Sequence, residues 1–405
     1  MSELSYMEKL LDGVEVESLT LGDIGEFIRG NGIQKKDFSE SGFPAVHYGQ
    51  IFTRYGFSAV QAFTFISSEL AKKSRIAQKN DLLIATTSEN DEDVLKSVAW
   101  LGEKVAISGD MMLFRHAQNV KYLAYYFQTE DFQKQKIKFI TGAKVRRVSK
   151  DSLAKMTIPI PSLDVQAEIV RILDAFTELT AELTAELVAR KQQYAYYRDQ
   201  LFIFDESQIE SKLLGDVTVY EQPTKYRVDS KDYDDDFLTP VLTAGKTFIL
   251  GYTNEVEGIY EASKIPVIIF DDFTTANKWV DFDFKVKSSA MKMVTSLDES
   301  VVMQKFIYYW LNILPSELVD GDHKRHWISN FAKKEIPVPS LAEQQRIVTI
   351  LDKFDALTTS LTEGLPREIA LRQQQYEYYR ELLLSFPKAE VANHDWTHQH
   401  HRRIE

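Results

Sequence analysis

The chain has 405 residues, 44% of them hydrophobic and 27% charged, which excludes a disordered polypeptide and allows two or three domains with buried cores. It has no cysteine, so disulfides and thiolate metal sites are excluded, and we expect a reducing compartment, the cytoplasm. The formal net charge of -12 argues against a polyanionic partner unless cations are concentrated locally, and no apolar stretch reaches the roughly 18 residues of a membrane span.

The first predicted element is a globular domain, which together with the N-terminal segment takes up residues 1–157. Short β-branched and aromatic runs alternate there with Gly, Pro and Asn breaks, a pattern typical of small mixed α/β domains. The end of this domain is basic, because from Lys134 to Lys155 the chain carries eight Lys or Arg residues and a single acid, Asp151. A solvated helix face and a binding surface both explain such a run.

A long helix is predicted next, within residues 158–208. The segment Ile-Pro-Ile-Pro that begins at Ile158 is extended, and Ser162 is a candidate N-cap, so the helix should start near Leu163. Its seam positions follow the alternating spacing of four and three residues that is typical of a coiled coil. They are Ile169, Leu173, Phe176, Thr180, Leu183, Leu187, Arg190, Tyr194, Tyr197 and Leu201.

A second mixed α/β domain is predicted for residues 209–335, and two short signals in it are typical of enzymes. Residues 243–247 end like a phosphate-binding loop, but Pro240 stands where that loop requires its first glycine, so the backbone cradle cannot form. The second signal is a group of three aspartates and one lysine, which are the residue types of a metal-dependent nuclease site. Charged residues at the edges of strands would give the same pattern. The members of this group are Asp271, Asp272, Asp283 and Lys285.

The last long element, within residues 336–388, repeats the central helix. The segment Ile158–Leu187 recurs 178 residues later with its Ile-Pro-x-Pro start, its serine and its Leu-Asp-x-Phe motif, and Tyr194–Leu201 recurs 182 residues later. The four inserted residues are close to one helical turn, so the apolar seam stays in register. Pro366 should kink or break this second helix. The second seam consists of Ile347, Leu351, Phe354, Thr358, Leu361, Leu365, Arg372, Tyr376, Tyr379 and Leu383.

The repeat predicts an α+β fold in which two globular α/β domains are separated by two long helices that pair as an antiparallel coiled coil, with a pseudo-two-fold internal repeat. Residues 389–405 are expected to be a flexible tail. Its histidines lack the packed surroundings that orient metal ligands, so we expect no metal site. The chain also lacks the motifs of amino-methyltransferases and a glycine-rich cofactor loop, and it should catalyse nothing alone.

These features resemble a known family. The segments IPIPSLDVQ and IPVPSLAEQ, the Leu-Asp-x-Phe motifs and the helix ends YYRDQL and YYRELL are similar to the conserved regions of the specificity subunit of type I restriction-modification systems. The resemblance covers essentially the whole chain. It implies two target-recognition domains that each read one half of a bipartite site in double-stranded DNA, with the coiled coil as the spacer that fixes the gap.

The resemblance also implies partners. In that family two methylation subunits carry S-adenosylmethionine and the adenine chemistry, and two restriction subunits, which use ATP and Mg²⁺, complete the restriction complex. The exposed faces of the long helices are expected to bind the methylation subunits. The chain itself is then expected to bind no cofactor and to be non-catalytic.

The DNA-contacting residues are expected just before each long helix, where the two halves align. KVRRVSKDSLAKMTIPIP lines up with HKRHWISNFAKKEIPVP, and each segment carries a pair of basic residues. Arginine can bind guanine bidentately, but phosphate contact is at least as common, and a structural loop also explains these residues. The candidates are Lys144, Arg146, Arg147, Lys324, Arg325, His326 and Trp327.

Two functions of other classes stay open at this point. The first is a stand-alone metal-dependent nuclease that uses Asp271, Asp283 and Lys285. The second is a coiled-coil scaffold that binds proteins and no nucleic acid. Cleavage of DNA by the purified chain with Mg²⁺ would favour the first, and the absence of any DNA sequence preference would favour the second.

Overall fold

The computed structural model describes residues 11, 14, 16–205, 207, 209–243, 248–315, 326–360 and 363–386. The chain divides into two compact units, one made of residues 1–182 with 370–405 and the other of residues 183–369. Each unit contains one globular domain and parts of the long helices. We call the described residues of 16–160 domain 1 and those of 209–338 domain 2. None of the helices in the described ranges is long and apolar enough to cross a membrane.

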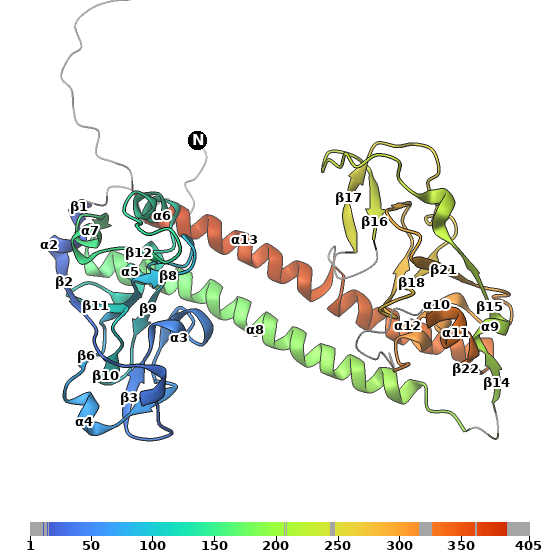
Figure 1. Ribbon diagram of the computed structural model, residues 1–405, viewed down its shortest axis with the longest axis horizontal. Coiled ribbons are helices and arrows are strands. Elements are labelled where there is room, and N and C mark those ends of the chain that lie inside the picture. Colours follow the sequence, from blue (N-terminus) through green and yellow to red (C-terminus); the bar gives the residue numbers. More distant parts are fainter. Residues whose placement is uncertain are drawn as a thin grey trace, which may run out of the picture. The chain divides into compact units, whose positions relative to one another are not determined.

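Domain 1 is built around a five-stranded sheet of order β2-β11-β7-β9-β4 and a four-stranded sheet of order β5-β3-β10-β6 (Figure 1). Its strands are β1 (Glu17–Thr20), β2 (Gly25–Arg29), β3 (Phe43–Val46), β4 (Ser58–Ala59), β5 (Thr64–Ile66), β6 (Arg75–Ala77), β7 (Leu82–Ala85), β8 (Thr87–Ser88), β9 (Ser97–Trp100), β10 (Val105–Ile107), β11 (Met111–His116), β12 (Arg146–Arg147) and β13 (Thr157–Ile160). Its helices are α2 (Leu21–Ile24), η1 (Lys35–Asp37), α3 (Tyr48–Thr53), α4 (Ser68–Ala71), α5 (Val120–Tyr126), α6 (Glu130–Ile137) and α7 (Lys150–Ala154).

Domain 2 has a four-stranded sheet of order β15-β21-β18-β19 and a three-stranded sheet of order β17-β16-β20. Its strands are β14 (Glu210–Leu213), β15 (Thr218–Glu221), β16 (Thr239–Leu242), β17 (Ile249–Thr253), β18 (Val267–Asp271), β19 (Asn277–Val280), β20 (Lys285–Val286), β21 (Met291–Ser296) and β22 (Glu335–Val338). Its helices are α9 (Leu214–Val217), η2 (Pro223–Tyr226), α10 (Gln304–Leu311), α11 (His326–Ser329) and η3 (Phe331–Lys333).

The two domains share a core topology, to which domain 1 adds the edge strands β4 and β6, although their sequences are only faintly alike. In the larger sheet of each domain, the strand that comes first in sequence pairs with the strand that comes last. These pairs are β2 with β11 in domain 1 and β15 with β21 in domain 2. Each second sheet contains one parallel pair, β3 with β10 and β16 with β20. Each domain also closes with a two-stranded sheet that joins its start to its end, β1 with β13 and β14 with β22. The internal repeat therefore extends through the globular domains.

The long helices begin where the sequence predicts. The central helix is α8 (Leu163–Leu201), and the distal repeat begins with α12 (Leu341–Thr358). The Oγ atoms of Ser162 and Ser340 accept hydrogen bonds from the backbone N–H groups of Val165 at 3.4 Å and Glu343 at 3.3 Å. A 39-residue α8 is about 58 Å long at about 1.5 Å per residue.

The predicted break of the second helix is confirmed. The helix α12 ends at Thr358, and α13 (Gly364–Leu384) carries Pro366 in its first turn, where the missing N–H needs no partner. Gly364 has a φ of +72°, and a Cβ at this position would lie 2.2 Å from the carbonyl oxygen of Ala356. The turn therefore requires glycine.

The predicted seam is visible in the burial of α8. Between residues 175 and 192 every residue of α8 is exposed except five seam residues, which are partly buried. They are Phe176, Thr180, Leu183, Leu187 and Arg190. The helices pair in opposite directions, because low-numbered α8 residues contact the end of α13 and high-numbered ones contact α12. Ring centroids lie 5.3 Å apart for Phe176 and Tyr379, 5.9 Å for Tyr194 and Phe354, and 6.0 Å for Tyr197 and Phe354.

The outer ends of the seam also pack against the domains. Ile169, Leu173 and Tyr376 belong to the core of domain 1, and Ile347 and Leu351 belong to the core of domain 2. These positions were predicted as spacer packing alone, and the structure extends their role to holding a domain on its helix. Leu361 lies outside the described residues.

Candidate nucleic-acid interface and its supports

The basic segment of domain 1 forms a tight loop against the sheet. Thr141 and Arg147 exchange two backbone hydrogen bonds of 2.9 Å, and the intervening Gly142 has a φ of +94° with no room for a Cβ beside the carbonyl of Val145. Arg146 and Arg147 form β12, which pairs with β8. The loop is thus held at its base by backbone hydrogen bonds while its tip is exposed.

The three predicted DNA contacts of domain 1 are accessible to different degrees. Lys144 and Arg147 are exposed, and no acid among the described residues forms an ion pair with either. Arg146 is half-buried, and its Nε lies 2.8 Å from the Oδ1 of Asp91. Lys144 and Arg147 are therefore the two cations best placed to meet phosphates or base edges.

Part of the basic run that precedes this loop has structural roles. Lys136 is only 1% exposed, and its Nζ donates a hydrogen bond of 2.8 Å to the backbone carbonyl of Glu92. Burial lowers the pKa of the Lys136 ammonium. Lys134 forms a surface ion pair of 2.8 Å with Glu130. The basic surface of domain 1 is therefore narrower than the sequence indicates.

In domain 2 the predicted contacts include two core residues. Lys324 and Arg325 lie outside the described residues. His326 and Trp327 are buried, and the Trp327 ring packs against Phe270 at a centroid distance of 5.0 Å. In this structure neither side chain is available to DNA, so we assign both to packing. Residue type alone favoured contact, because an aromatic next to cations is also typical of a binding surface.

Val148 and His326, the residues that follow the two basic pairs in sequence, are hydrogen-bonded at equivalent points of the two domains. Met111 faces Ala85 in domain 1, and Met291 faces Asp271 in domain 2, so the next residues, Thr86 and Asp272, are equivalent. The carbonyl of Thr86 accepts a hydrogen bond of 3.2 Å from the N–H of Val148, and the carbonyl of Asp272 accepts one of 3.0 Å from the N–H of His326. Each donor directly follows a basic pair in sequence, as the alignment predicts.

The chemistry around these attachment points differs between the domains. The Asp272 carboxylate accepts a hydrogen bond of 2.8 Å from the N–H of Trp327 and lies 3.7 Å from Lys292 Nζ. Asp272 and Lys292 are 2% and 1% exposed. Domain 1 has Thr86 and Met112 at the equivalent positions. A buried ion pair in domain 2 thus replaces a hydroxyl and a thioether in domain 1.

The nuclease alternative finds no support in the structure. Asp271 accepts hydrogen bonds from the N–H of Phe273 and the hydroxyl of Thr274, and Lys285 forms an ion pair of 2.7 Å with Glu255.

Asp283 is equally engaged within the fold. Its Oδ1 accepts hydrogen bonds from the hydroxyl and the N–H of Ser263, which hold the pKa of the Asp283 carboxyl below its ordinary value. Among the described residues no group of three or more His, Asp or Glu side chains could hold a metal ion. These side chains are explained by turns and ion pairs of the fold.

Each long helix holds its domain through a buried glutamine. Gln166 is fully buried; its Nε2 donates to the carbonyl of Pro161 at 2.9 Å and to Gln118 Oε1 at 2.8 Å, and its Oε1 accepts from the N–H of Asn119 at 3.0 Å. In domain 2 the Nε2 of Gln344 donates to the carbonyls of Pro339 at 2.8 Å and Val301 at 3.0 Å, and its Oε1 accepts from the N–H of Met303 at 2.8 Å, so a backbone carbonyl takes the place of the Gln118 side chain. Both glutamines match in the sequence repeat, but the sequence alone does not show which residues of each domain they bind.

A second contact lies further along each helix, at the aspartate of the Leu-Asp-x-Phe motif. Asp174 contacts Lys121 Nζ at 2.6 Å and accepts a hydrogen bond of 2.8 Å from the Tyr125 hydroxyl. In domain 2, Asp352 lies 3.0 Å from Lys305 Nζ and accepts a hydrogen bond from the Tyr309 hydroxyl. Burial, reinforced by the carboxylate, raises the pKa of each tyrosine, which therefore stays a hydrogen-bond donor.

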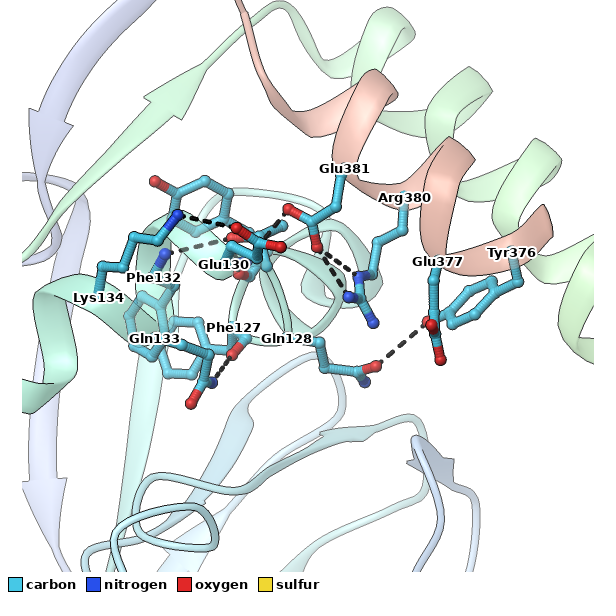
Figure 2. Close-up of polar contacts among 12 residues, drawn as sticks. Phe127, Gln128, Glu130, Phe132, Gln133, Lys134, Tyr376, Glu377, Arg380 and Glu381 are labelled. Carbon is cyan, nitrogen blue, oxygen red and sulfur yellow. Dashed lines mark hydrogen bonds and ion pairs between the residues drawn. The ribbon is translucent and has the colours of Figure 1, made fainter. Parts of the chain in front are cut away.

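The end of α13 docks on domain 1 through polar contacts (Figure 2). The Tyr376 hydroxyl donates to Gln128 Oε1 at 3.2 Å, and the N–H of Glu130, in the first turn of α6, donates to Glu381 Oε2 at 3.1 Å. A carboxylate at a helix N-terminus is favourable because the unpaired N–H groups of the first turn point towards it. A shallow cavity of about 530 Å³ adjoins this contact, lined in part by Tyr378.

The repeated ends of α8 and α13 present the same surface. Arg190 donates to Gln193 at 2.7 Å, and Arg372 donates to Gln375 at 2.9 Å. Arg198 pairs with Asp199, and Arg380 pairs with Glu381, each at 2.7 Å. The equivalent tyrosines Tyr196 and Tyr378 are 61% and 63% exposed. Large aromatic side chains exposed at equivalent points of a repeat are typical of a surface that binds a partner.

Comparison with known proteins gives a consistent result. A family model described as a type I restriction modification DNA specificity domain matches residues 13–190 and 207–371. The chain is 62% identical over 196 residues to the type I restriction enzyme EcoR124I/EcoR124II specificity subunit of Escherichia coli, a match that covers 47% of this chain and 48% of that protein. It is 30% identical over 408 residues to the type I restriction enzyme EcoprrI specificity subunit of Escherichia coli, with 90% and 93% covered.

A solved structure shares the fold. The crystal structure of a type I restriction-modification system S subunit from M. genitalium aligns with a TM-score of 0.58 at 14% identity, and the alignment covers 95% of this chain and 100% of that one.

Proposed function

The chain belongs to the type I restriction-modification DNA specificity family, and we propose that it is the DNA-recognition subunit of a type I restriction-modification complex. Domain 1 reads one half of a bipartite site, domain 2 reads the other half, and the paired long helices fix the spacing between the halves. The observation that carries this proposal is the shared core topology of two domains, in which the residue that follows a basic pair in sequence is hydrogen-bonded at equivalent points, Thr86 and Asp272.

Divergent domains on a common scaffold fit a site with two different halves. A rigid helical spacer can hold two readers about one helical turn of DNA, about 34 to 36 Å, apart. Lys144 and Arg147 in domain 1, and Lys324 and Arg325 in domain 2, contact phosphates or base edges. The acidic total charge is compatible with this role, because a partner subunit can supply further cations to the DNA.

The repeated surfaces around Tyr196 and Tyr378 are where we place two methylation subunits. Two equivalent faces on one chain suit two copies of one partner, since each copy meets the same side chains. The partner subunits carry the cofactors, S-adenosylmethionine for adenine methylation and ATP with Mg²⁺ for restriction. The chain itself directs these activities without catalysing them.

Sequencing of adenine methylation in cells with and without the chain tests the proposal. Co-expression with the methylation subunit should produce methylation at one bipartite motif with a fixed spacer, and deletion of this chain should abolish it. Methylation that is unchanged by the deletion would contradict the proposal. Cleavage of DNA by the purified chain with Mg²⁺ alone would support the nuclease alternative instead.

A further inference from the structure

We propose that two repeated side chains on each long helix set the angle at which a domain is held for reading DNA. They are Gln166 and Asp174 for domain 1 and Gln344 and Asp352 for domain 2. We call each pair, with its domain partners, an anchor. The inference rests on the proposed function, because a reading angle matters only if the domains read DNA.

Each anchor holds its domain at two separate points on one face of a helix. The glutamine and the aspartate are eight residues apart in both repeats. Eight residues make about two turns, so both side chains lie on the same face, about 12 Å apart. A single contact would leave the domain free to pivot about it, whereas two separated contacts fix its rotation along the helix.

The domain side of the anchor is repeated as well. Lys121 and Tyr125 are four residues apart on α5, and Lys305 and Tyr309 are four residues apart on α10. This spacing places lysine and tyrosine on one face of the domain helix, and both reach the same carboxylate. Two otherwise divergent domains therefore present one Lys-x-x-x-Tyr pattern to one aspartate.

The anchor is kept even where the chain around it changes. In domain 1 the Asn119 side chain caps α5 by accepting from the N–H groups of Lys121 and Tyr122. In domain 2 the longer turn between β21 and α10 places Met303 at the N-cap, which makes no side-chain cap, and Glu299 accepts from the N–H of Gln304 at 3.0 Å instead. The turn thus differs in length and capping, and one acceptor of the glutamine changes from the Gln118 side chain to the Val301 carbonyl. The backbone N–H donor to the glutamine and the Lys and Tyr contacts to the aspartate are kept.

The aspartate contact can be removed without dismantling a core. Lys121 and Asp174 side chains are each 25% exposed, so their contact lies at the edge of the interface. Ile169 and Leu173 are fully buried beside it and still hold the helix on domain 1. Loss of the polar contact should therefore loosen the angle of the domain more than it unfolds the domain.

The test uses the full chain in complex with its methylation subunits. A Lys121→Met, Tyr125→Phe double variant removes both partners of Asp174, and Lys305→Met, Tyr309→Phe is the matched change in domain 2. The measurement is the ratio of methylation at sites whose spacer is one base pair too long or too short to methylation at the normal spacer. We expect each double variant to raise this ratio at least fivefold, and Lys264→Met, which removes a surface pair with Glu261, to leave it unchanged.

Two single variants of the domain 1 anchor show whether the loss of a contact or the loss of folding changes the ratio. Tyr125→Phe alone removes the hydrogen bond to Asp174 and the contact with the Thr177 hydroxyl, and it keeps the Lys121 pair. It should raise the ratio about twofold, which keeps the test informative if the double variant does not fold. Lys121→Arg keeps the charge and should retain the normal ratio. Folded double variants with an unchanged ratio would overturn the inference, leaving only a structural role. A wild-type complex with no bipartite motif would instead overturn the proposed function.

Discussion

Domain 1 and domain 2 each hydrogen-bond the residue that follows a basic pair at equivalent points of equivalent sheets, but different side chains support the contact. In domain 1, Thr86 accepts the backbone N–H of Val148 and the adjoining β8 pairs with β12. In domain 2, the Asp272 side chain takes over the second contact by accepting from Trp327, with Lys292 beside it. The comparison teaches that the backbone attachment is the repeated feature, whereas the side chains that support it have diverged.

The largest expected difference between the domains concerns this buried pair. Asp272→Ala leaves the Lys292 ammonium buried without its carboxylate, which should cost about 3 to 5 kcal/mol of unfolding free energy. Thr86→Ala at the equivalent position removes a methyl group and a hydroxyl that donates to the carbonyl of Asp110, and it should cost about 1 kcal/mol because no charge is left unpaired. Urea unfolding followed by amide hydrogen exchange in each domain measures both losses.

A double variant sharpens this comparison. Asp272→Thr with Lys292→Met copies domain 1 and should recover most of the stability lost in Asp272→Ala, because it removes the unpaired charge. Equal losses in Asp272→Ala and Thr86→Ala would show that the buried pair does not distinguish the domains.

The next largest expected difference is that the free energy of unfolding of domain 1, and not that of domain 2, falls as the pH is lowered. Burial lowers the pKa of His116 to about 4, and Ser296 is the equivalent residue of domain 2. Below about pH 6.5 the unfolded chain binds a proton that the folded His116 does not, so stability is lost as the pH falls towards 4. Between pH 6.5 and 5 domain 1 should lose about 2 kcal/mol relative to domain 2.

Hydrogen exchange at the two pH values measures this difference, and His116→Ser is the matched control. The substitution copies domain 2 and should remove most of the dependence in this pH window, and the rest is expected from His47, whose pKa burial also lowers. A loss that persists in His116→Ser would assign it to other groups.

The helices and the repeat could be predicted from the sequence, because they are encoded in local spacing. Ser162 and Ser340 mark helix starts, and Pro366 marks the break, through chemistry that acts within one turn. The shared topology of the domains was missed, because strand pairing joins residues far apart in sequence, such as β2 with β11.

The DNA contacts of Lys144, Arg146, Arg147, Lys324 and Arg325 stay a prediction. The alignment of the two segments agrees with the equivalent hydrogen bonds of Val148 to Thr86 and His326 to Asp272. The burial of His326 and Trp327 could not be seen, because the same residue types suit a surface and a core. The partners of Asp174 were also out of reach, since Lys121 and Tyr125 stand 53 and 49 residues before it in the chain.

A smaller effect is expected at the exposed loop of domain 1. Lys144→Ala with Arg147→Ala removes two cations, so the slope of log affinity against log salt concentration should fall by about two for non-specific duplex DNA. Fluorescence anisotropy at several salt concentrations measures this slope. Lys134→Ala is the control, because Lys134 is paired with Glu130. A slope unchanged in the double variant would remove the loop from the interface.

The smallest expected effect concerns the acid that neutralises Arg146. Asp91→Asn frees this arginine from a half-exposed ion pair worth about 0.2 to 1 kcal/mol, so non-specific DNA affinity should rise by about two- to fivefold. The same anisotropy titration measures the change. A decrease in affinity would instead show that Asp91 positions Arg146 for binding.

The central claim, that each domain reads one half of a bipartite site, is tested most directly by methylome sequencing of two paired variants. Lys144→Ala with Arg147→Ala alters domain 1, and Lys324→Ala with Arg325→Ala alters domain 2. The account predicts that each variant relaxes the sequence preference in one half of the methylated motif, a different half in each case, with the spacer unchanged. Variants that both relax the same half, or that leave both halves intact, would contradict it.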